Sequence, residues 1–271
     1  MGKYQILLTN DDGIQSPGLW AAAEALSELG FVTVAAPRDQ SSGMGRSLPS
    51  SSDGTLRTEL VQVRGKEWTV HAVGGSPAQA VLHGILEIMP QPPDLVVSGI
   101  NYGENVATGV TSSGTVGAAL EAASHGIPSL AMSLETDREH HFSYSKEIDF
   151  SAAAYFTTVF ARQLLEKQFP PDVDVLKVDV PCDATRETPW QVSCLARQRY
   201  YVSLPPKRKT WTEPGRLDYA EAAELGEEYK GSDVYVLRVQ REVSVTPLSL
   251  DITSRVDLAV LNRLLRNGVV M

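Results

Sequence analysis

The chain has 271 residues, 42% of them hydrophobic and 21% charged, which are ordinary values for a globular protein large enough to bury a sizeable core. Its net charge of -9 argues against a broad face for a nucleic acid duplex, because phosphate backbones require clustered cations, whereas a small phosphorylated substrate needs only a local positive site. No apolar run of roughly eighteen residues predicts a membrane-spanning helix, so we expect no membrane partner.

The amino terminus leads directly into an apolar segment and leaves no room for a signal peptide. The only cysteines, Cys182 and Cys194, are too few for a disulfide framework, and we expect both to be small buried apolar residues. These features predict a cytoplasmic protein.

The first predicted strand, Tyr4–Thr9, is a short apolar run that stops just before two adjacent carboxylates, Asp11 and Asp12. Ser16 then provides a helix N-cap ahead of a proline, and apolar residues at helical spacing continue towards Gly30, where the helix is expected to end. The two carboxylates therefore lie between the carboxyl end of a strand and the amino end of a helix, which is where open α/β sheets bind ligands.

Two neighbouring carboxylates at 4 Å repel each other by about 4 kcal/mol at an effective dielectric of 20, so such a pair needs an offset. A hard divalent cation such as Mg²⁺, Mn²⁺ or Ca²⁺ is the simplest offset for oxygen ligands. The alternative is that both aspartates only cap the following helix and interact with its positive end.

Further elements are predicted from short apolar or β-branched runs and from helix-start signals. Strands are expected at Phe31–Ala36, Leu56–Arg64, Trp68–Val73, Leu95–Ser98 and Ser129–Ser133, the second and third of them forming a hairpin. Helices are expected after Ser76-Pro77, after Ser112–Thr115 and over Ile148–Leu165. Polar, glycine-containing loops separate them at Arg38–Ser47 and Gly99–Gly109.

The helix start at Ser113 is a candidate anion site, because a first turn offers free N–H groups and the positive end of the helix dipole. The same residue can also cap the helix. His140 and His141 are expected in a solvated polar loop, since no third ligand stands at a recognisable zinc spacing.

Strands predominate from Val173 onward, and they are predicted at Val175–Val180, Gln191–Leu195, Tyr200–Leu204, Val234–Val239 and Val243–Leu248, with a final helix at Val256–Leu265. A basic and aromatic cluster in this region fits a solvated hairpin face, a wall of the substrate site or an oligomer contact. Its members are Arg197, Arg199, Tyr200, Tyr201, Lys207, Arg208, Lys209 and Trp211.

The alternation of strands and helices up to about residue 180 predicts an α/β fold with a doubly wound, mostly parallel, Rossmann-like sheet. We expect residues 1–180 to form this catalytic domain. Residues 181–271 are expected to form an appended β-rich arm for oligomerisation and a C-terminal helix.

In a parallel sheet, the loops that follow successive strands open on the same edge. This brings together Asp11, Asp12, Ser42, Asn101, Ser113, Gly114 and Thr115. Oxygen ligands beside an anion site predict metal-assisted hydrolysis of a phosphomonoester through a metal-activated water. A covalent aspartyl-phosphate is disfavoured, because Asn10 stands where haloacid dehalogenase-type phosphatases need a carboxylate. A nucleotide-binding or scaffold protein with little or no turnover is the alternative.

Several motifs resemble the survival protein SurE family of 5'/3'-nucleotidases. They are Thr9–Gly18, Ala36-Pro37 with Ser42 and Gly45–Ser47, Pro93–Asn101, Ser113–Val116 and Val245–Leu248. The resemblance implies hydrolysis of nucleoside monophosphates and one divalent metal, Mg²⁺ or Mn²⁺, held by Asp11, Asp12, Ser42 and Asn101. Asp11 or Asp12 would orient the attacking water. The resemblance further implies phosphate contacts near Asn10, Gly43, Ser113, Gly114 and Thr115, and a homodimer or homotetramer built through the C-terminal region.

The chain departs from the family pattern around the expected substrate. It has Gly45-Arg46-Ser47 where Gly-His-Ser is usual, Gly75–Ala80 where Gly-Thr-Pro-Ala-Asp-Cys is usual, and Ser193–Ala196 in place of Thr-Arg-Gln-Ser. The expected metal ligands are unchanged, so these departures bear on base preference and rate.

Overall fold

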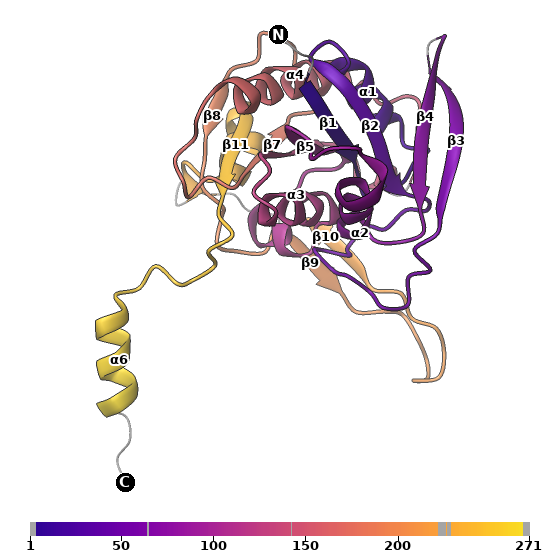
Figure 1. Ribbon diagram of the computed structural model, residues 1–271. Helices are drawn as coiled ribbons and strands as arrows, with labels where there is room; N and C mark the ends of the chain where they lie inside the picture. The colour runs from indigo at the N-terminus through magenta and orange to yellow at the C-terminus, as the bar shows by residue number, and fades with distance from the viewer. Residues whose placement is uncertain (1–3, 64, 142, 222–225, 227–228, 268–271) are drawn as a thin grey trace.

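The apolar runs of the sequence assemble into a nine-stranded sheet in the computed structural model, which describes residues 4–63, 65–141, 143–221, 226 and 229–267. Its strands are β1 (Tyr4–Thr9), β2 (Gly30–Pro37), β3 (Leu56–Val63), β4 (Lys66–Val73), β5 (Leu95–Tyr102), β6 (Ser129–Leu134), β7 (Val175–Val180), β8 (Trp190–Val192) and β11 (Val243–Leu248). The strand order is β3-β4-β2-β1-β5-β6-β7-β11-β8, and all pairs from β4 to β7 are parallel (Figure 1). The predicted mostly parallel α/β sheet is therefore confirmed.

Antiparallel pairing occurs towards both edges of the sheet. β3 pairs with β4 in the predicted hairpin, and β11 pairs antiparallel with β7 before β8 adds to it in parallel. Strands β8 and β11 come from beyond residue 180 and complete the same sheet, while the domain division that we placed there stays a prediction.

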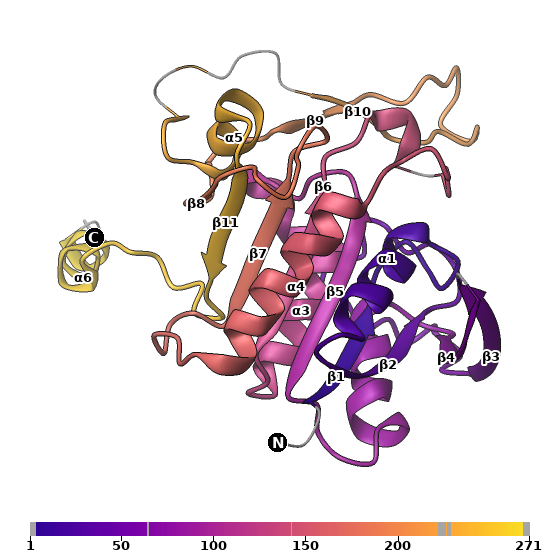
Figure 2. The ribbon, with the colours of Figure 1, turned by 90° about the horizontal axis from the view of Figure 1, so that it is seen from above.

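Helices cover both faces of the sheet (Figure 2). On one face α1 (Pro17–Leu26) packs against α4 (Ser151–Glu166), and on the other α2 (Pro77–His83) packs against α3 (Gly114–Ser124). A π-helical segment, Gly84–Ile88, continues α2. This two-sided cover buries every residue of β5, β6 and β7, as is usual for parallel strands.

The alternation of side chains along a strand supplies both cores at once. Leu8 and Val97 point into the core beneath α1 and α4, whereas their neighbours Leu7 and Val96 belong to the core beneath α2 and α3.

The direction of winding reverses between β1 and β5. The chain runs outward from β1 to β2 and β4, returns to β5 beside β1, and then continues to β6 and β7. The carboxyl ends of β1 and β5 therefore flank a topological switch point, where the connections diverge and leave a crevice for ligands.

A second, two-stranded sheet of β9 (Tyr201–Leu204) and β10 (Asp218–Glu221) lies across this carboxyl end of the large sheet (Figure 2). β9 corresponds to a predicted strand, and β10 was not predicted. A C-terminal arm ends in α6 (Leu258–Asn267), which stands apart from the body (Figure 1). Within the described part of the chain, no helix has the length and apolar character that a membrane crossing requires.

The predicted strand at Val234–Val239 is wrong. This segment forms α5 (Asp233–Tyr235) and a π-helical turn, Val236–Gln240. Ser232 caps the helix, since its hydroxyl accepts a hydrogen bond from the Tyr235 N–H. A short β-branched run fits a buried strand or a buried helix equally well by periodicity, and the cap decides for the helix.

Several boundaries and burial predictions also differ from the structure. The first helix ends at Leu26, so Gly30 begins β2 instead of ending the helix, and α4 begins at Ser151 rather than Ile148. Cys182 and Cys194, expected to be buried, are exposed free thiols because both lie in connections near the sheet edge.

Candidate active site

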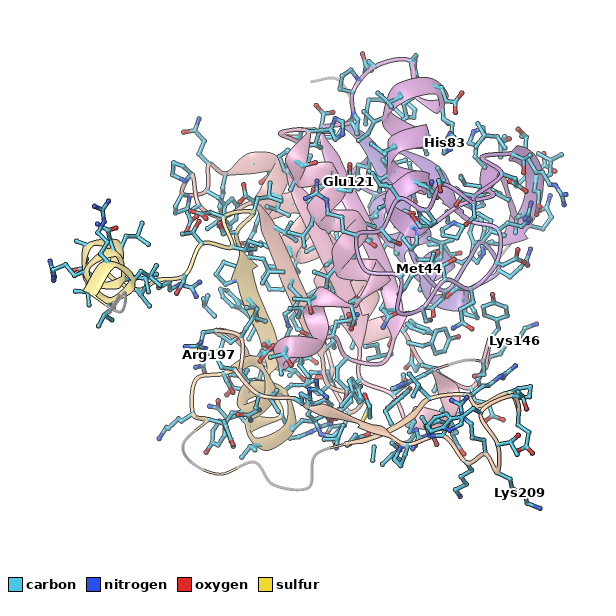
Figure 3. All side chains as sticks on the ribbon, turned by 90° about the horizontal axis from the view of Figure 1, so that it is seen from below. Met44, His83, Glu121, Lys146, Arg197 and Lys209 are labelled. Atoms are coloured by element: carbon cyan, nitrogen blue, oxygen red, sulfur yellow. The ribbon has the colours of Figure 1, made fainter. Side chains whose placement is uncertain are left out.

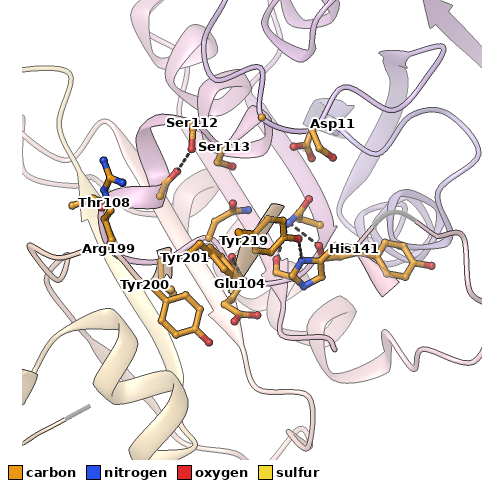
Figure 4. Close-up of a pocket in the computed structure, with 18 of the residues that line it drawn as sticks. Asp11, Glu104, Thr108, Ser112, Ser113, His141, Arg199, Tyr200, Tyr201 and Tyr219 are labelled. Atoms are coloured by element: carbon orange, nitrogen blue, oxygen red, sulfur yellow. Dashed lines mark hydrogen bonds between the residues drawn. The ribbon is translucent and has the colours of Figure 1, made fainter. Parts of the chain in front are cut away.

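A pocket of about 460 Å³ opens at the carboxyl ends of β1 and β5 (Figure 4). Its walls come from the loop after β1, the loop after β2, the segment from the end of β5 to the start of α3, and the β9–β10 sheet. The lining residues that matter below are Asp11, Ser42, Gly43, Asn101, Glu104, Ser113, His141, Arg199, Tyr201, Ser203 and Tyr219.

Asp11 follows the end of β1 in sequence, and residues at the start of α3 contact its side chain. Its Oδ1 accepts a hydrogen bond of 2.6 Å from the Thr115 hydroxyl. A Cβ atom on Gly114 would lie 2.7 Å from the Asp11 Cβ, so only glycine permits this approach of helix and carboxylate. The start of α3 thereby fixes the orientation of Asp11.

Asp12 is held from two other directions. Its Oδ2 accepts a 3.2 Å hydrogen bond from the backbone N–H of Tyr102 in β5, and its Oδ1 accepts one of 3.3 Å from the Gln40 amide. Its own carbonyl accepts from the Tyr144 hydroxyl at 2.7 Å. Three segments distant in sequence therefore determine where Asp12 points.

The acidic pair has no cationic partner in the described part of the chain. Asp11 is 4% exposed and Asp12 2% exposed, and neither forms an ion pair with a Lys, Arg or His side chain of the described residues. Burial raises the pKa of Asp11, although hydrogen bonds from Thr115 and Gly114 oppose this. Burial, together with the adjacent charge of Asp11, raises the pKa of Asp12 well above its usual range. A buried acidic pair without an ion-pair partner among the described residues offers oxygen ligands that fit a hard divalent cation.

Asn101 reaches the pocket from the end of β5, where the register with β6 shifts between Ser98 and Asn101. Bulges of this kind re-aim side chains next to functional sites. The Asn101 Nδ2 donates to the carbonyl oxygens of Tyr102 at 3.2 Å and Gly103 at 2.7 Å. The amide is thereby oriented, and Oδ1 remains as its potential ligand atom.

The loop that carries Ser42 is docked on α3. The Arg46 Nε donates a 2.6 Å hydrogen bond to Oε2 of Glu121, a carboxylate whose side chain is 7% exposed and which Figure 3 labels. A Cβ on Gly117 would lie 2.3 Å from the backbone of Gly45, so loop and helix are in backbone contact there. Helix α3 therefore positions both Asp11 and the loop of Ser42.

Of the five predicted phosphate contacts, two line the pocket and three do not. Gly43 and Ser113 line the pocket, and the Ser113 hydroxyl accepts from the Val116 N–H at 3.1 Å, which leaves its hydrogen available to a ligand. Asn10 is fully buried, with its amide bonded to the backbone of Gly13. Gly114 and Thr115 are in contact with Asp11, as described above.

An aromatic wall, defined as His141, Tyr201 and Tyr219, closes the side of the pocket formed by the β9–β10 sheet (Figure 4). The prediction of a solvated histidine is wrong for His141, which is 9% exposed. Its Nδ1 forms a hydrogen bond of 2.8 Å with the Tyr219 hydroxyl. Sequence reasoning missed this residue because its partner Tyr219 is distant in sequence. Only the neighbourhood of Tyr201 carried a signal, namely the basic and aromatic cluster.

That cluster divides between the pocket and solvent. Arg199, Tyr200 and Tyr201 line the pocket. Trp211, by contrast, is 91% exposed, and Lys209 lies at the far end of the projecting β9–β10 connection (Figure 3).

Glu104 was not recognised from the sequence. Its side chain is buried, and neither carboxylate oxygen meets the distance and angle of a hydrogen bond within the described structure. The nearest cation is Arg238, with 3.6 Å between Nη1 and Oε1. Burial raises the pKa of Glu104 to about 7.

The fold and the pocket define an α/β protein with an acidic, oxygen-lined site at the switch point of its sheet. The family model described as survival protein SurE matches residues 6–202. This chain belongs to the SurE family.

Curated relatives match almost the whole chain. The 5'-nucleotidase SurE of Thermococcus gammatolerans is 42% identical over 262 residues, which cover 96% of each chain. That of Archaeoglobus fulgidus is 44% identical over 254 residues, covering 93% of this chain and 94% of the relative. The crystal structure of the SurE protein from Aquifex aeolicus is similar with a TM-score of 0.72 and 31% identity, over 97% of this chain and 99% of that one.

Proposed function

We propose that this protein is a metal-dependent phosphomonoester hydrolase that acts on nucleoside monophosphates as a 5'-nucleotidase. The observation that carries the proposal is the buried pair of Asp11 and Asp12, which has no ion-pair partner among the described residues and of which Asp11 lines the pocket beside the start of α3. The names of the relatives, 5'-nucleotidase SurE, support the substrate class.

Asp11, Asp12, Ser42 and Asn101 are the residues that would hold one divalent cation, Mg²⁺ or Mn²⁺. When bound, such a cation polarises a phosphoryl oxygen and lowers the pKa of water, which is the chemistry that phosphomonoester hydrolysis requires. The pair is suited to this ligand because its charges are already buried and oriented by Thr115, Tyr102 and Gln40.

The remaining groups of the pocket would orient the phosphate. Ser113 at the start of α3 would offer its hydroxyl, and Gly43 of the loop docked on α3 would offer its backbone, since both line the pocket. An aspartate oxygen, from Asp11 or Asp12, would accept the proton of the attacking water. The hydrogen bonds to both carboxylates hold them in place for this role, which reduces reorganisation during the reaction.

Phosphate release from a panel of nucleoside 5'- and 3'-monophosphates and p-nitrophenyl phosphate tests the proposal. We expect release with Mg²⁺ or Mn²⁺, loss in EDTA and recovery when the metal is restored. Asp12→Asn should reduce release to background while circular dichroism stays unchanged, and full activity of this variant contradicts the metal site.

Glu28→Gln is a matched control, since it removes an exposed carboxylate that follows the end of α1 and does not line the pocket. It should retain wild-type release. If no substrate releases phosphate although nucleotides bind, the protein is a nucleotide-binding member with little turnover.

We also propose a homodimer or homotetramer. The apolar side chains of α6 support this, because Leu258, Leu264 and Leu265 are 59%, 66% and 68% exposed. A cytoplasmic location is our proposal as well, and the free thiols of Cys182 and Cys194 agree with a reducing compartment.

A further inference from the structure

The aromatic wall is built on one face of the two-stranded sheet. Tyr201 pairs with Glu221 and Ser203 pairs with Tyr219 in the antiparallel register, so these four side chains share a face. Tyr201, Ser203 and Tyr219 line the pocket from that face. The β9–β10 sheet thus presents alternate residues to the cavity.

The rings of the wall are fixed relative to one another. Tyr201 and Tyr219 have ring centroids 5.2 Å apart at an interplanar angle of 76°, and His141 and Tyr201 are 6.1 Å apart at 90°. The Tyr219 hydroxyl lies 2.8 Å from His141 Nδ1, and His141 Nε2 lies 3.2 Å from the Thr136 carbonyl. These edge-to-face contacts and hydrogen bonds organise the wall without a ligand.

Other contacts anchor the wall to the body. Arg138 forms an ion pair with Asp218 of β10, and its guanidinium carbon lies 4.7 Å from the Tyr219 ring centroid. Arg138 therefore packs on the Tyr219 ring, which is also stacked with His141 at 6.2 Å between centroids, and Tyr219 lines the pocket. These contacts fix the aromatic wall to the body of the protein.

The wall and Asp11 occupy different sides of the same pocket (Figure 4). A volume of about 460 Å³ is within the range of pockets that enclose a small organic ligand. If the phosphate lies beside Asp11 and Ser113, the organic part of the substrate extends towards the aromatic rings.

We propose that His141, Tyr201 and Tyr219 form a subsite for the base of the nucleotide, which binds by ring contacts. This inference rests on the proposed nucleotidase function and specifies how its substrate is recognised. Every base has an aromatic face, so such a surface tolerates all bases but discriminates against a substrate without one. The enzyme should therefore accept purine and pyrimidine nucleotides and disfavour ribose 5-phosphate.

The test compares kcat/KM for AMP, CMP and ribose 5-phosphate in the wild type, Tyr219→Ala and Tyr219→Phe. We expect AMP and CMP to exceed ribose 5-phosphate by about tenfold or more, the size that one stacked ring contributes. Tyr219→Ala should lose most of this preference through a higher KM for the nucleotides. Tyr219→Phe keeps the ring and should retain the preference.

Trp211→Ala is the matched control, because it removes an aromatic ring from the same β9–β10 connection at a 91% exposed position outside the pocket. It should behave as the wild type. Equal kcat/KM for AMP and ribose 5-phosphate in the wild type would overturn the subsite while leaving the phosphatase function intact. An equal fall for all substrates in Tyr219→Ala would also overturn it, since that result indicates a structural role.

Adenosine binding by isothermal titration calorimetry provides a readout without turnover. Binding to the wild type and Trp211→Ala, weakened about tenfold or more in Tyr219→Ala, supports the subsite even if no phosphate is released. Absence of phosphate release would then count against the proposed function alone. Absence of adenosine binding to the wild type would count against the subsite.

Discussion

At the scale of single residues, the molecule concentrates unfavourable charge at one place. Asp11 and Asp12 are buried side by side, and the burial raises the pKa of both carboxyls. A folded protein retains such a pair only if the surrounding structure holds it, here through Thr115, Tyr102 and Gln40. The destabilisation is what a bound cation would relieve.

The first prediction concerns the free energy of unfolding that the repulsion between Asp11 and Asp12 removes. Asp12→Asn removes one of two like charges, so in EDTA at pH 7 it should raise the free energy of unfolding by on the order of 2 kcal/mol. Urea denaturation measures the change. Mg²⁺ or Mn²⁺ should raise the melting temperature of the wild type and leave that of the variant nearly unchanged. A variant less stable than the wild type in EDTA would contradict the repulsion argument.

The second prediction concerns Glu104, whose pKa burial raises to about 7 from a usual value of 4.5. Because the folded state binds this proton more tightly than the unfolded state, the contribution to stability is present below pH 4.5 and is lost as the pH rises to about 7. Glu104→Gln removes the titrating carboxyl, so the stability of this variant should not fall with pH for this reason. Between pH 5 and pH 8 the wild type should lose about 3 kcal/mol relative to the variant in urea denaturation.

Parallel pH profiles for the wild type and Glu104→Gln would show that Glu104 is not the titrating group. Glu28→Gln, at an exposed position, serves as the control and should keep the wild-type profile.

At the scale of elements, α3 is the common anchor of the candidate site. Its first turn contacts Asp11, and further along the helix Glu121 binds Arg46 of the loop that carries Ser42. One helix therefore fixes the positions of residues that come from separate loops. This is how second-layer contacts commonly hold the ligands of a metal site in place.

The third prediction tests this anchor. Arg46→Met removes the guanidinium that pairs with the buried Glu121, so the loop should lose its fixed position on α3. We expect the apparent affinity for Mg²⁺ or Mn²⁺, followed by thermal shift, to weaken about tenfold. Arg162→Met is the control, because Arg162 forms only a 3.9 Å pair with Glu166 on exposed parts of α4. An unchanged metal affinity in Arg46→Met would show that the ion pair does not position the loop.

At the scale of the whole molecule, the body and the C-terminal arm differ in how they bury apolar surface. The body places its side chains in cores on both faces of the sheet, whereas α6 leaves the body with its apolar residues uncovered (Figure 1). Exposed apolar surface of this kind marks an interaction site. A second copy of the chain is the partner that we propose for it.

The fourth prediction follows from this proposal. Introducing charge into the apolar face with the double change Leu261→Asp and Leu265→Asp should convert the oligomer into a monomer, as measured by light scattering after size exclusion. Arg263→Asp changes an exposed polar position of the same helix and should leave the oligomer intact. A wild-type protein that is already monomeric would contradict the proposal.

Much of the fold could be predicted because local patterns determine it. The apolar runs of β1, β5, β6 and β7, the hairpin of β3 and β4, and the capped starts of α2 and α3 depend on neighbours in sequence. Val234–Val239 could not be assigned this way, because a short β-branched run suits a strand or a helix. Its burial beside Tyr200 and Val106 depends on contacts with distant residues.

The sequence by itself determined that Asp11 and Asp12 follow a strand and that Ser113 caps a helix, since these depend on spacing along the chain. Asn101 was expected in a loop after Ser98, but β5 extends to Tyr102 and includes it. Only the tertiary structure decided that the strand order reverses between β1 and β5, which opens the pocket there. It also decided that Gln40 bonds Asp12 and that His141 and Tyr219 complete the pocket, because these contacts join segments that are far apart in sequence. Local periodicity carries no information about such long-range contacts.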